Sequence, residues 1–297
     1  MKLNLIAIVA LCATSALGGW ETKLTMENDT FLKKDDSDYT HGTKLDVVDR
    51  GRGLHYILQQ TMYAPPDLSL KHHVPGDRPY AGVLLGGVGY EFFRDVQSPW
   101  SHYGEFNFGV IGPSAGCKET QTFIHKILHC HKPMGWDDQL HDEPILNAQW
   151  WTRYSWFLNS WVAIVPKAGV TMGNLQDFGE IGCDLKVGWN IERPTDNGMI
   201  FSAVEKTPWQ EKLSAYAFVG ASERYYIYNH ILQGSMFNHK DDNLKVGIER
   251  WVSELRVGLV FRYSRFFATY YAIFRTDEYK RQERSPDFGG IGIGWIF

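Results

Sequence analysis

Three stretches of the chain, 102–112, 181–190 and 251–262, alternate apolar and polar residues with a period of two. That period is typical of a β-strand whose two faces meet different surroundings. The apolar sides carry Phe106, Phe108, Val110, Ile181, Cys183, Leu185, Val187, Trp189, Trp251, Leu255, Val257, Leu259 and Phe261, and the opposite sides carry Glu105, Asn107, Asp184, Lys186, Glu254, Arg256 and Arg262. Charged residues on the second face fit a polar lumen, because lipid would penalise them by about 2–4 kcal/mol at the membrane mid-plane.

The last segment, 287–297, repeats this pattern with small residues on one side. One face is apolar, and the other holds Gly292 and Gly294. The apolar face carries Ile291, Ile293, Trp295 and Phe297. Such a strand suits a wall between lipid and a filled lumen.

The same reading along the whole chain predicts about twelve strands, an even number as bacterial barrels require. They are expected near 20–31, 39–49, 54–63, 79–92, 100–112, 146–157, 161–173, 178–190, 213–227, 248–262, 265–276 and 287–297. With both chain ends in the periplasm, long connections fall outside the cell and short ones, such as 50–53 and 158–160, fall inside. The segment 191–212 is an exception, a long connection on the periplasmic side.

The other end of the chain predicts export. Residues 1–18 contain Lys2, an apolar stretch over 5–13 and small residues before Gly19, which is the pattern of a secretory signal peptide. Past it there is no apolar run of the length that a membrane-spanning helix needs. We therefore expect an all-β protein, a transmembrane antiparallel β-barrel of the bacterial outer membrane, with one domain over 19–297.

Composition agrees with that expectation. Aromatic residues make up 14% of the 297 residues, with 11 Trp and 15 Tyr, as two interfacial girdles would require. The net charge of −4 gives no basic footprint for nucleic acid. The partners expected are the membrane and its lipids, and the barrel is expected to be a monomer.

The longest external connection, 113–145, is predicted to hold a short helix over about 117–130. Apolar residues recur there at helical spacing, and Gln121, His125 and His129 recur four apart on another face. A histidine on a helix is usually a surface or packing residue, but it is also the side chain best suited to general-base chemistry near neutral pH. His125, with Gln121 beside it, is therefore a candidate catalytic residue.

The first predicted hairpin concentrates hard oxygen ligands, a set that suits Ca²⁺. The residues concerned are Glu27, Asn28, Asp29, Asp36, Asp38, Tyr39, Thr40 and Gly42. Asn, Asp and Ser also populate turns for local backbone reasons, so ordinary hairpin chemistry is the alternative. If Leu24 and Met26 face lipid, Asp29 points inward, and Thr40 joins it if Leu45 and Val47 face lipid. Asn28 and Asp29 can then share one ion only if the strand bulges or ends there.

Three further groups of residues are alternative candidate functional sites. Residues 112–116 match G-x-S-x-G between a strand and a helix, which makes Ser114 a candidate nucleophile, although that motif belongs to α/β sheets. His125, His129 and His131 with Cys130 raise the question of zinc, without a confident third ligand. Lys71 and Arg78 precede the fourth predicted strand and are candidates for a cationic lip that holds lipid phosphates.

Six motifs in order carry a family resemblance over essentially the whole mature chain. They are Glu27-Asn28-Asp29, Asp38-Tyr39-Thr40-x-Gly42, Gly76-Asp77-Arg78-Pro79-Tyr80, Ile111-Gly112-Pro113, Gln121-x-x-x-His125 and Gly135-Trp136-x-x-Gln139. Together they resemble the lipid A 3'-O-deacylases, outer-membrane enzymes. The resemblance implies a twelve-stranded barrel that needs Ca²⁺ and removes the 3'-linked acyloxyacyl chain of lipid A, the anchor of lipopolysaccharide in the outer leaflet.

Carried over by motif, the resemblance makes His125 the base that activates water, with Gln121 assisting on the same helix face. Asn28, Asp29, Thr40 and Gly42 would build or support the calcium site, facing the cell exterior. Lys71 matches a basic residue of the family. His131 stands where the family has an acidic residue, and Asp137, Asp138 or Glu143 are possible substitutes.

Two rival functions stay open on the sequence. One is an outer-membrane phospholipase with Ser114 as nucleophile, and the other is a barrel channel or adhesin without catalysis. The sequence also places Cys117 and Cys130 at opposite ends of the predicted helix. A regular helix would hold them about 20 Å apart, beyond the reach of a disulfide, so we expect no bond between them.

Overall fold

The computed structural model describes residues 19–32, 38–92, 98–129, 131–191, 193–194, 205–206 and 213–297. The predicted signal peptide, 1–18, and most of the connection 191–212 lie outside the described residues. Within the latter, Arg193–Pro194 (β10) pairs with Glu205–Lys206 (β11).

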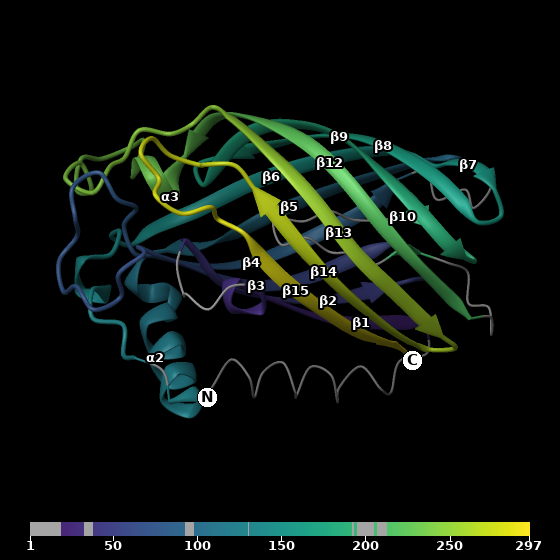
Figure 1. Ribbon diagram of the computed structural model, residues 1–297, viewed down its shortest axis with the longest axis horizontal. Helices are drawn as coiled ribbons and strands as arrows, with labels where there is room; N and C mark the ends of the chain where they lie inside the picture. Colours follow the sequence, from purple (N-terminus) through teal and green to yellow (C-terminus); the bar gives the residue numbers. More distant parts are fainter. Residues whose placement is uncertain are drawn as a thin grey trace.

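A single antiparallel sheet closes on itself to form a barrel (Figure 1). Its strands are β1 (Trp20–Asn28), β2 (Asp38–Asp49), β3 (Leu54–Ala64), β4 (Ala81–Phe92), β5 (Trp100–Ile111), β6 (Glu143–Tyr154), β7 (Trp156–Asn159), β8 (Val162–Gly173), β9 (Gln176–Trp189), β12 (Ser214–Asn229), β13 (Trp251–Tyr263), β14 (Phe266–Arg275) and β15 (Phe288–Ile296). Because β6 and β7 both pair with β8 and are separated only by Ser155, they occupy one place in the wall. The described wall therefore has twelve strand positions, which confirms the prediction, and β1 pairs with β15 to close it.

The two faces of the wall follow the alternation seen in the sequence. On the outer face, Ile181 is 67% exposed and Leu259 is 60% exposed, whereas Glu254 and Arg256 on the lumen face are buried. In β15 the lumen face holds Gly294, where a Cβ atom would lie 2.0 Å from the ring of Phe267. The small residues of the last strand therefore make room for rings inside the barrel. No helix of the described residues is long and apolar enough to cross a membrane.

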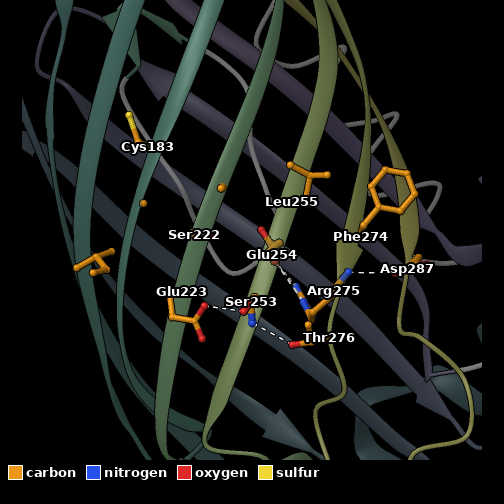
Figure 2. Close-up of a pocket in the computed structure, with 13 residues that line it drawn as sticks. Cys183, Ser222, Glu223, Ser253, Glu254, Leu255, Phe274, Arg275, Thr276 and Asp287 are labelled. Carbon is orange, nitrogen blue, oxygen red and sulfur yellow. Dashed lines mark hydrogen bonds and ion pairs between the residues drawn. The ribbon is translucent and has the colours of Figure 1, made fainter.

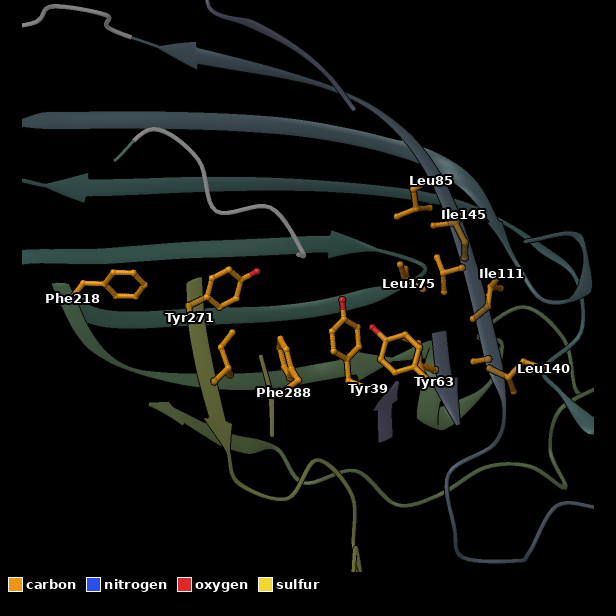
Figure 3. Close-up of a cluster of buried hydrophobic side chains, with 14 of the residues drawn as sticks. Tyr39, Tyr63, Leu85, Ile111, Leu140, Ile145, Leu175, Phe218, Tyr271 and Phe288 are labelled. Atoms are coloured by element: carbon orange, nitrogen blue, oxygen red, sulfur yellow. The ribbon is translucent and has the colours of Figure 1, made fainter. Parts of the chain in front are cut away.

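Ion pairs and aromatic rings occupy the lumen. Lys167 Nζ lies 3.0 Å from Glu180, and Arg275 Nη2 lies 2.8 Å from Glu254. A cluster of buried apolar side chains also crosses the lumen (Figure 3). It includes Tyr39, Tyr63, Leu85, Ile111, Leu140, Ile145, Phe218, Tyr271 and Phe288. Buried charges are stable here because they are paired, as their desolvation requires.

The long connections gather at one end of the barrel (Figure 1). We call this end the loop rim and define it by the segments 65–80, 112–142, 230–250 and 276–287. It carries a single turn, α3 (His230–Gln233), and a longer helix, α2 (Cys117–Leu128). The helix predicted over 117–130 is thereby confirmed within two residues of its end.

Candidate active site at the loop rim

The helix α2 is held against the outer face of β3 and β4. Gln60 and Met62 point outward on β3 yet are buried, and Gln60 Nε2 donates a 2.7 Å hydrogen bond to the carbonyl oxygen of Ala115. On β4, a Cβ atom at Gly82 would lie 2.7 Å from Cys117, so the glycine lets the start of α2 approach the wall. The helix begins after Gly116, whose φ of 69° is left-handed and suits glycine.

This packing buries one stripe of α2, and the stripe includes His125. The exposed fraction of His125 is 8%, and its Nδ1 atom lies 2.5 Å from the carbonyl oxygen of His131. A carbonyl oxygen can only accept a hydrogen bond, so Nδ1 of neutral His125 carries the proton. The lone pair is then on Nε2, which is the arrangement that a general base needs.

Gln121, one turn earlier on the same stripe, is fixed by Trp136. The indole Nε1 of Trp136 donates a 2.6 Å hydrogen bond to Gln121 Oε1, and both residues are almost fully buried. The Trp136 ring contacts the ring of Tyr80, with centroids 4.9 Å apart, and Gln139 Nε2 donates to the carbonyl oxygen of Trp136. Three of the sequence motifs, which contain Tyr80, Gln121 and Trp136, therefore meet at α2. Sequence reasoning gave Tyr80 and Trp136 no role of their own, although both lie in those motifs.

The hairpin proposed for calcium meets the geometric condition set by the sequence. β1 ends at Asn28, and a 3-10 turn, η2 (Asp29–Phe31), follows directly. Asn28 Oδ1 accepts a hydrogen bond from the backbone nitrogen of Thr30 at 2.7 Å, while the Asp29 side chain is buried. The Thr40 hydroxyl is also buried and makes no hydrogen bond within the described part of the chain. A buried carboxylate and an unused hydroxyl oxygen are ligands of the kind that Ca²⁺ takes, so these residues fit the ion.

A bulge at Thr40 changes the side-chain directions expected for the second strand. The β2–β3 register shifts between Tyr39 and His41, so Tyr39 faces the lumen and its hydroxyl donates a 2.6 Å hydrogen bond to Glu27. A Cβ atom at Gly42 would lie 1.9 Å from that hydroxyl. The glycine is thus explained by the approach of Tyr39, and its predicted part in a calcium site stays a prediction.

The hairpin and the helix α2 lie next to each other at this end of the barrel. The hairpin includes β2, and α2 packs against β3, the strand that pairs with β2. Met62 pairs with His41 across β2 and β3, directly beside Thr40. Met62 also belongs to the buried cluster beneath α2, together with Cys117 and Trp136.

Within the described ranges, no three His, Cys, Asp or Glu side chains come together as a metal cluster. The zinc alternative therefore gains no support, although Cys130 lies outside the described residues.

Arg78 does not form the cationic lip that the sequence suggested. It is buried, and its guanidinium lies 3.3 Å from Asp38 and 3.3 Å from Glu278, with the ring of Tyr63 beneath it. Burial alone would lower the pKa of Arg78, but the two carboxylates outweigh it and raise the pKa. The residue therefore joins two segments of the loop rim, 65–80 and 276–287, to the start of β2. Lys71 is exposed, and its predicted contact with substrate stays a prediction.

This arrangement makes Arg78 important for stability. Replacing it with alanine should destabilise the barrel by about 3–5 kcal/mol, because Asp38 and Glu278 would stay buried without their shared cation. The midpoint of thermal unfolding in detergent measures the effect. Arg52→Ala is the matched control, since that side chain is 75% exposed and its pair with Asp49 is worth under about 1 kcal/mol. Equal midpoints for the two variants would contradict the role given to Arg78.

The acidic residues suggested as substitutes for His131 have other partners. Asp137 pairs with Lys118, and Glu143 accepts a 2.9 Å hydrogen bond from Asn238. Asp138 accepts hydrogen bonds from His72 and the backbone of His73, and the bond from His72 is the main reason that its pKa lies below the usual range. The side chain of His131 is exposed, and its backbone oxygen is the atom that contacts His125.

Ser114 and Cys117 are also accounted for. The Ser114 hydroxyl donates a 2.8 Å hydrogen bond to Asp142, and the surrounding sheet is antiparallel, not the α/β sheet of a nucleophile elbow. Cys117 is a buried free thiol. Cys130 lies outside the described residues, so the expectation that these two cysteines form no bond with each other stays a prediction.

A hollow of about 760 Å³ lies elsewhere, on the outer face over β9, β12, β13 and β14 (Figure 2). Its lining includes Cys183, Glu223, Leu255 and Phe274, and no residue of the sequence motifs. In Figure 2 the Glu223 carboxylate lies beside Ser253, whose hydroxyl donates to it at 2.6 Å. This hollow is separate from the cluster of motif residues at α2.

Comparison with known proteins settles the family. The model of the family described as "Outer membrane protein LpxR" matches residues 3–297. The chain belongs to the LpxR family. Among solved structures, the LpxR of Salmonella typhimurium aligns with a TM-score of 0.79 and 21% identity over 93% of this chain and all of that one. This LpxR structure shares the fold of the present barrel, and the family places the chain in the outer membrane.

Other barrels resemble the chain less. The translocator domain of the autotransporter NalP from Neisseria meningitidis aligns with a TM-score of 0.44 and 10% identity, over 100% of this chain and 96% of that one. The KdgM porin aligns with a TM-score of 0.41 and 8% identity, over 93% of this chain and 99% of that one. A sequence comparison with curated proteins finds no match.

Proposed function

We propose that this protein is a calcium-dependent carboxylic ester hydrolase that removes the 3'-linked acyloxyacyl chain of lipid A at the cell exterior. A lipid A deacylase function fits the LpxR family. The observation that carries the proposal is the hydrogen bond from His125 to the backbone of His131, which leaves Nε2 as the basic nitrogen. The substrate is the lipopolysaccharide of the outer leaflet, and the barrel acts as a monomer.

In the proposed reaction, His125 Nε2 takes a proton from water, and the water oxygen attacks the ester carbonyl. The bond between the carbonyl carbon and the 3' oxygen of the sugar then breaks, and His125 gives its proton to that leaving oxygen. Asp29 and Thr40, with Asn28 beside them, would hold Ca²⁺, and the bound ion would supply a Lewis acid for the charge that develops on the carbonyl oxygen. The chain itself orients the base through the His131 carbonyl and orients Gln121 through Trp136. No nucleophilic side chain is needed.

The two rivals are less well supported. A phospholipase that used Ser114 would need a base at that hydroxyl, whose partner is Asp142. A channel would need an open lumen, whereas the lumen of the described barrel holds paired charges and a cluster of large rings.

Cells with and without the gene test the proposed activity. Lipid A extracted from cells that make the protein should lose the mass of one acyloxyacyl chain, and lipid A from cells without it should not. An identical lipid A profile in the two strains, with folded barrel present in the membrane, would favour the channel or adhesin.

Trp136 should act as a positioning residue for Gln121. Trp136→Phe keeps a ring against Tyr80 but removes the donor to Gln121, and a buried acceptor without its partner costs about 1–3 kcal/mol. We expect kcat to fall about tenfold with a smaller change in KM. Trp161→Phe, at an exposed turn, is the control. If kcat is unchanged in a folded Trp136→Phe barrel, the orientation of Gln121 does not matter to turnover.

A further inference from the structure

The helix α2 exposes two large apolar side chains one turn apart. Phe123 is 37% exposed and Ile127 is 58% exposed. At about 100° per residue, they lie together, roughly 160° around the helix from the buried stripe that contains Gln121 and His125. The helix therefore has an apolar flank in addition to the face that contacts the barrel.

The apolar flank continues the lipid-facing wall. α2 covers the outer face of β3 and β4, and the outward side chains of Leu84 and Val110 pack against the cluster beneath it. Next to Val110 on the same face of β5, Phe108 is 53% exposed. Because an outer-membrane barrel meets lipid on that face, the surface around α2 borders the membrane.

The direction of α2 suits the membrane surface. In Figure 1 it projects from the side of the barrel at the loop rim and runs roughly across the barrel's long axis. A barrel stands along the membrane normal, so a helix that crosses its axis lies close to the membrane plane. That is the direction of helices that rest in the interface.

The charges on and after α2 complete the pattern. Thr122 and Lys126 occupy a third side of the helix, and Lys126 is exposed. The segment that follows adds His131 and Lys132, both exposed. Interfacial helices combine basic residues on a polar side with Phe or Leu on the other, because the basic groups attract lipid phosphates.

We propose that α2 is an interfacial helix, with Phe123 and Ile127 inserted among the acyl chains of the leaflet around the loop rim. Lys126 and Lys132 face the anionic phosphates of that leaflet. The partner is thus a lipid surface, bound by the chain whether or not it is the substrate. One consequence rests on the proposed function: the anchored helix holds His125 at the depth where acyl esters begin.

The depth of α2 can be measured without any activity. In a background with Cys130 and Cys183 replaced by serine, a fluorophore is attached at Ile127→Cys, at Phe123→Cys or at Thr122→Cys, the matched control on the polar side. The barrel is reconstituted in vesicles of phosphatidylethanolamine and phosphatidylglycerol. Chain-labelled doxyl lipid should quench positions 123 and 127 several-fold more than position 122, and aqueous iodide should show the reverse order. Equal iodide quenching at all three positions would overturn the proposal.

A second variant tests the consequence for catalysis. Phe123→Ser combined with Ile127→Ser should lower the rate on lipopolysaccharide in vesicles about tenfold, as weakened interfacial binding predicts. The rate on substrate dispersed in detergent should stay within about twofold of the unmodified protein. Equal loss on both substrates would show that the two residues support the fold or the site rather than membrane anchoring. If the unmodified protein has no activity, the proposed function fails while the quenching result still decides the position of α2.

Discussion

His125→Ala should lower the turnover of lipid A deacylation by at least about 10²-fold, the usual scale for loss of a general base. The His125 ring is held by the His131 carbonyl, so its basic nitrogen has a fixed direction. Alanine removes the base and leaves the barrel wall untouched, because α2 lies outside the sheet. Turnover on purified lipopolysaccharide measures the effect, and heat-modifiable gel mobility checks that the barrel is folded.

Two matched variants separate this base from its rivals. His129→Ala changes an exposed histidine at the end of the same helix and should leave turnover near that of the unmodified protein. Ser114→Ala should also change little, and inhibitors that label serine nucleophiles should not attach. The opposite pattern, with Ser114→Ala inactive and His125→Ala active, would establish the serine mechanism.

Asp29→Ala should abolish deacylation to a similar extent while the barrel still folds. Asp29 is the buried carboxylate at the end of β1, and it carries the negative charge that the proposed calcium site requires. Asp29→Asn should raise the calcium concentration for half-maximal activity at least about tenfold, because it removes that charge and keeps the shape. Asp242→Ala, at an exposed residue paired with Lys245, is the control. Unchanged calcium dependence in Asp29→Asn would remove Asp29 from the site.

Thr40 offers a sharper version of the same test. Its buried hydroxyl has no hydrogen bond within the described residues, so Thr40→Val should leave thermal stability unchanged or slightly higher. If the oxygen is a calcium ligand, the valine variant should still need more calcium, and Thr40→Ser should restore the original requirement. A valine variant with normal calcium dependence would show that the hydroxyl is only a packing group.

The sequence predicted the barrel well because each strand meets lipid on one side and the lumen on the other. Apolar and polar residues therefore alternate along each strand, as in 181–190 and 251–262. The ends of this alternation also predict the strand ends to within a few residues. The interruption at Ser155 and the bulge at Thr40 were not predicted. Both depend on how one strand pairs with its neighbour, and residue types alone do not report that pairing.

The contacts of the candidate site could not be predicted from residue types, and the roles of its residues stay predictions. The four-residue spacing that places Gln121 and His125 on one helix face was visible in the sequence. The hydrogen bond from His125 to His131 was not, because it uses a backbone oxygen, which every residue has. Arg78 was misjudged because one of its carboxylate partners, Glu278, lies 200 residues away along the chain. Such a long-range pair converts a basic loop residue into a buried structural one.

Mass spectrometry of lipid A incubated with the purified barrel tests the central claim most directly. The reaction is run with added calcium and, in parallel, with a chelator. We predict loss of the 3'-linked acyloxyacyl chain with calcium, no change with chelator, and recovery when calcium is restored. Intact lipid A in the presence of calcium would contradict the proposed hydrolase, and equal deacylation in chelator would contradict the calcium-assisted mechanism.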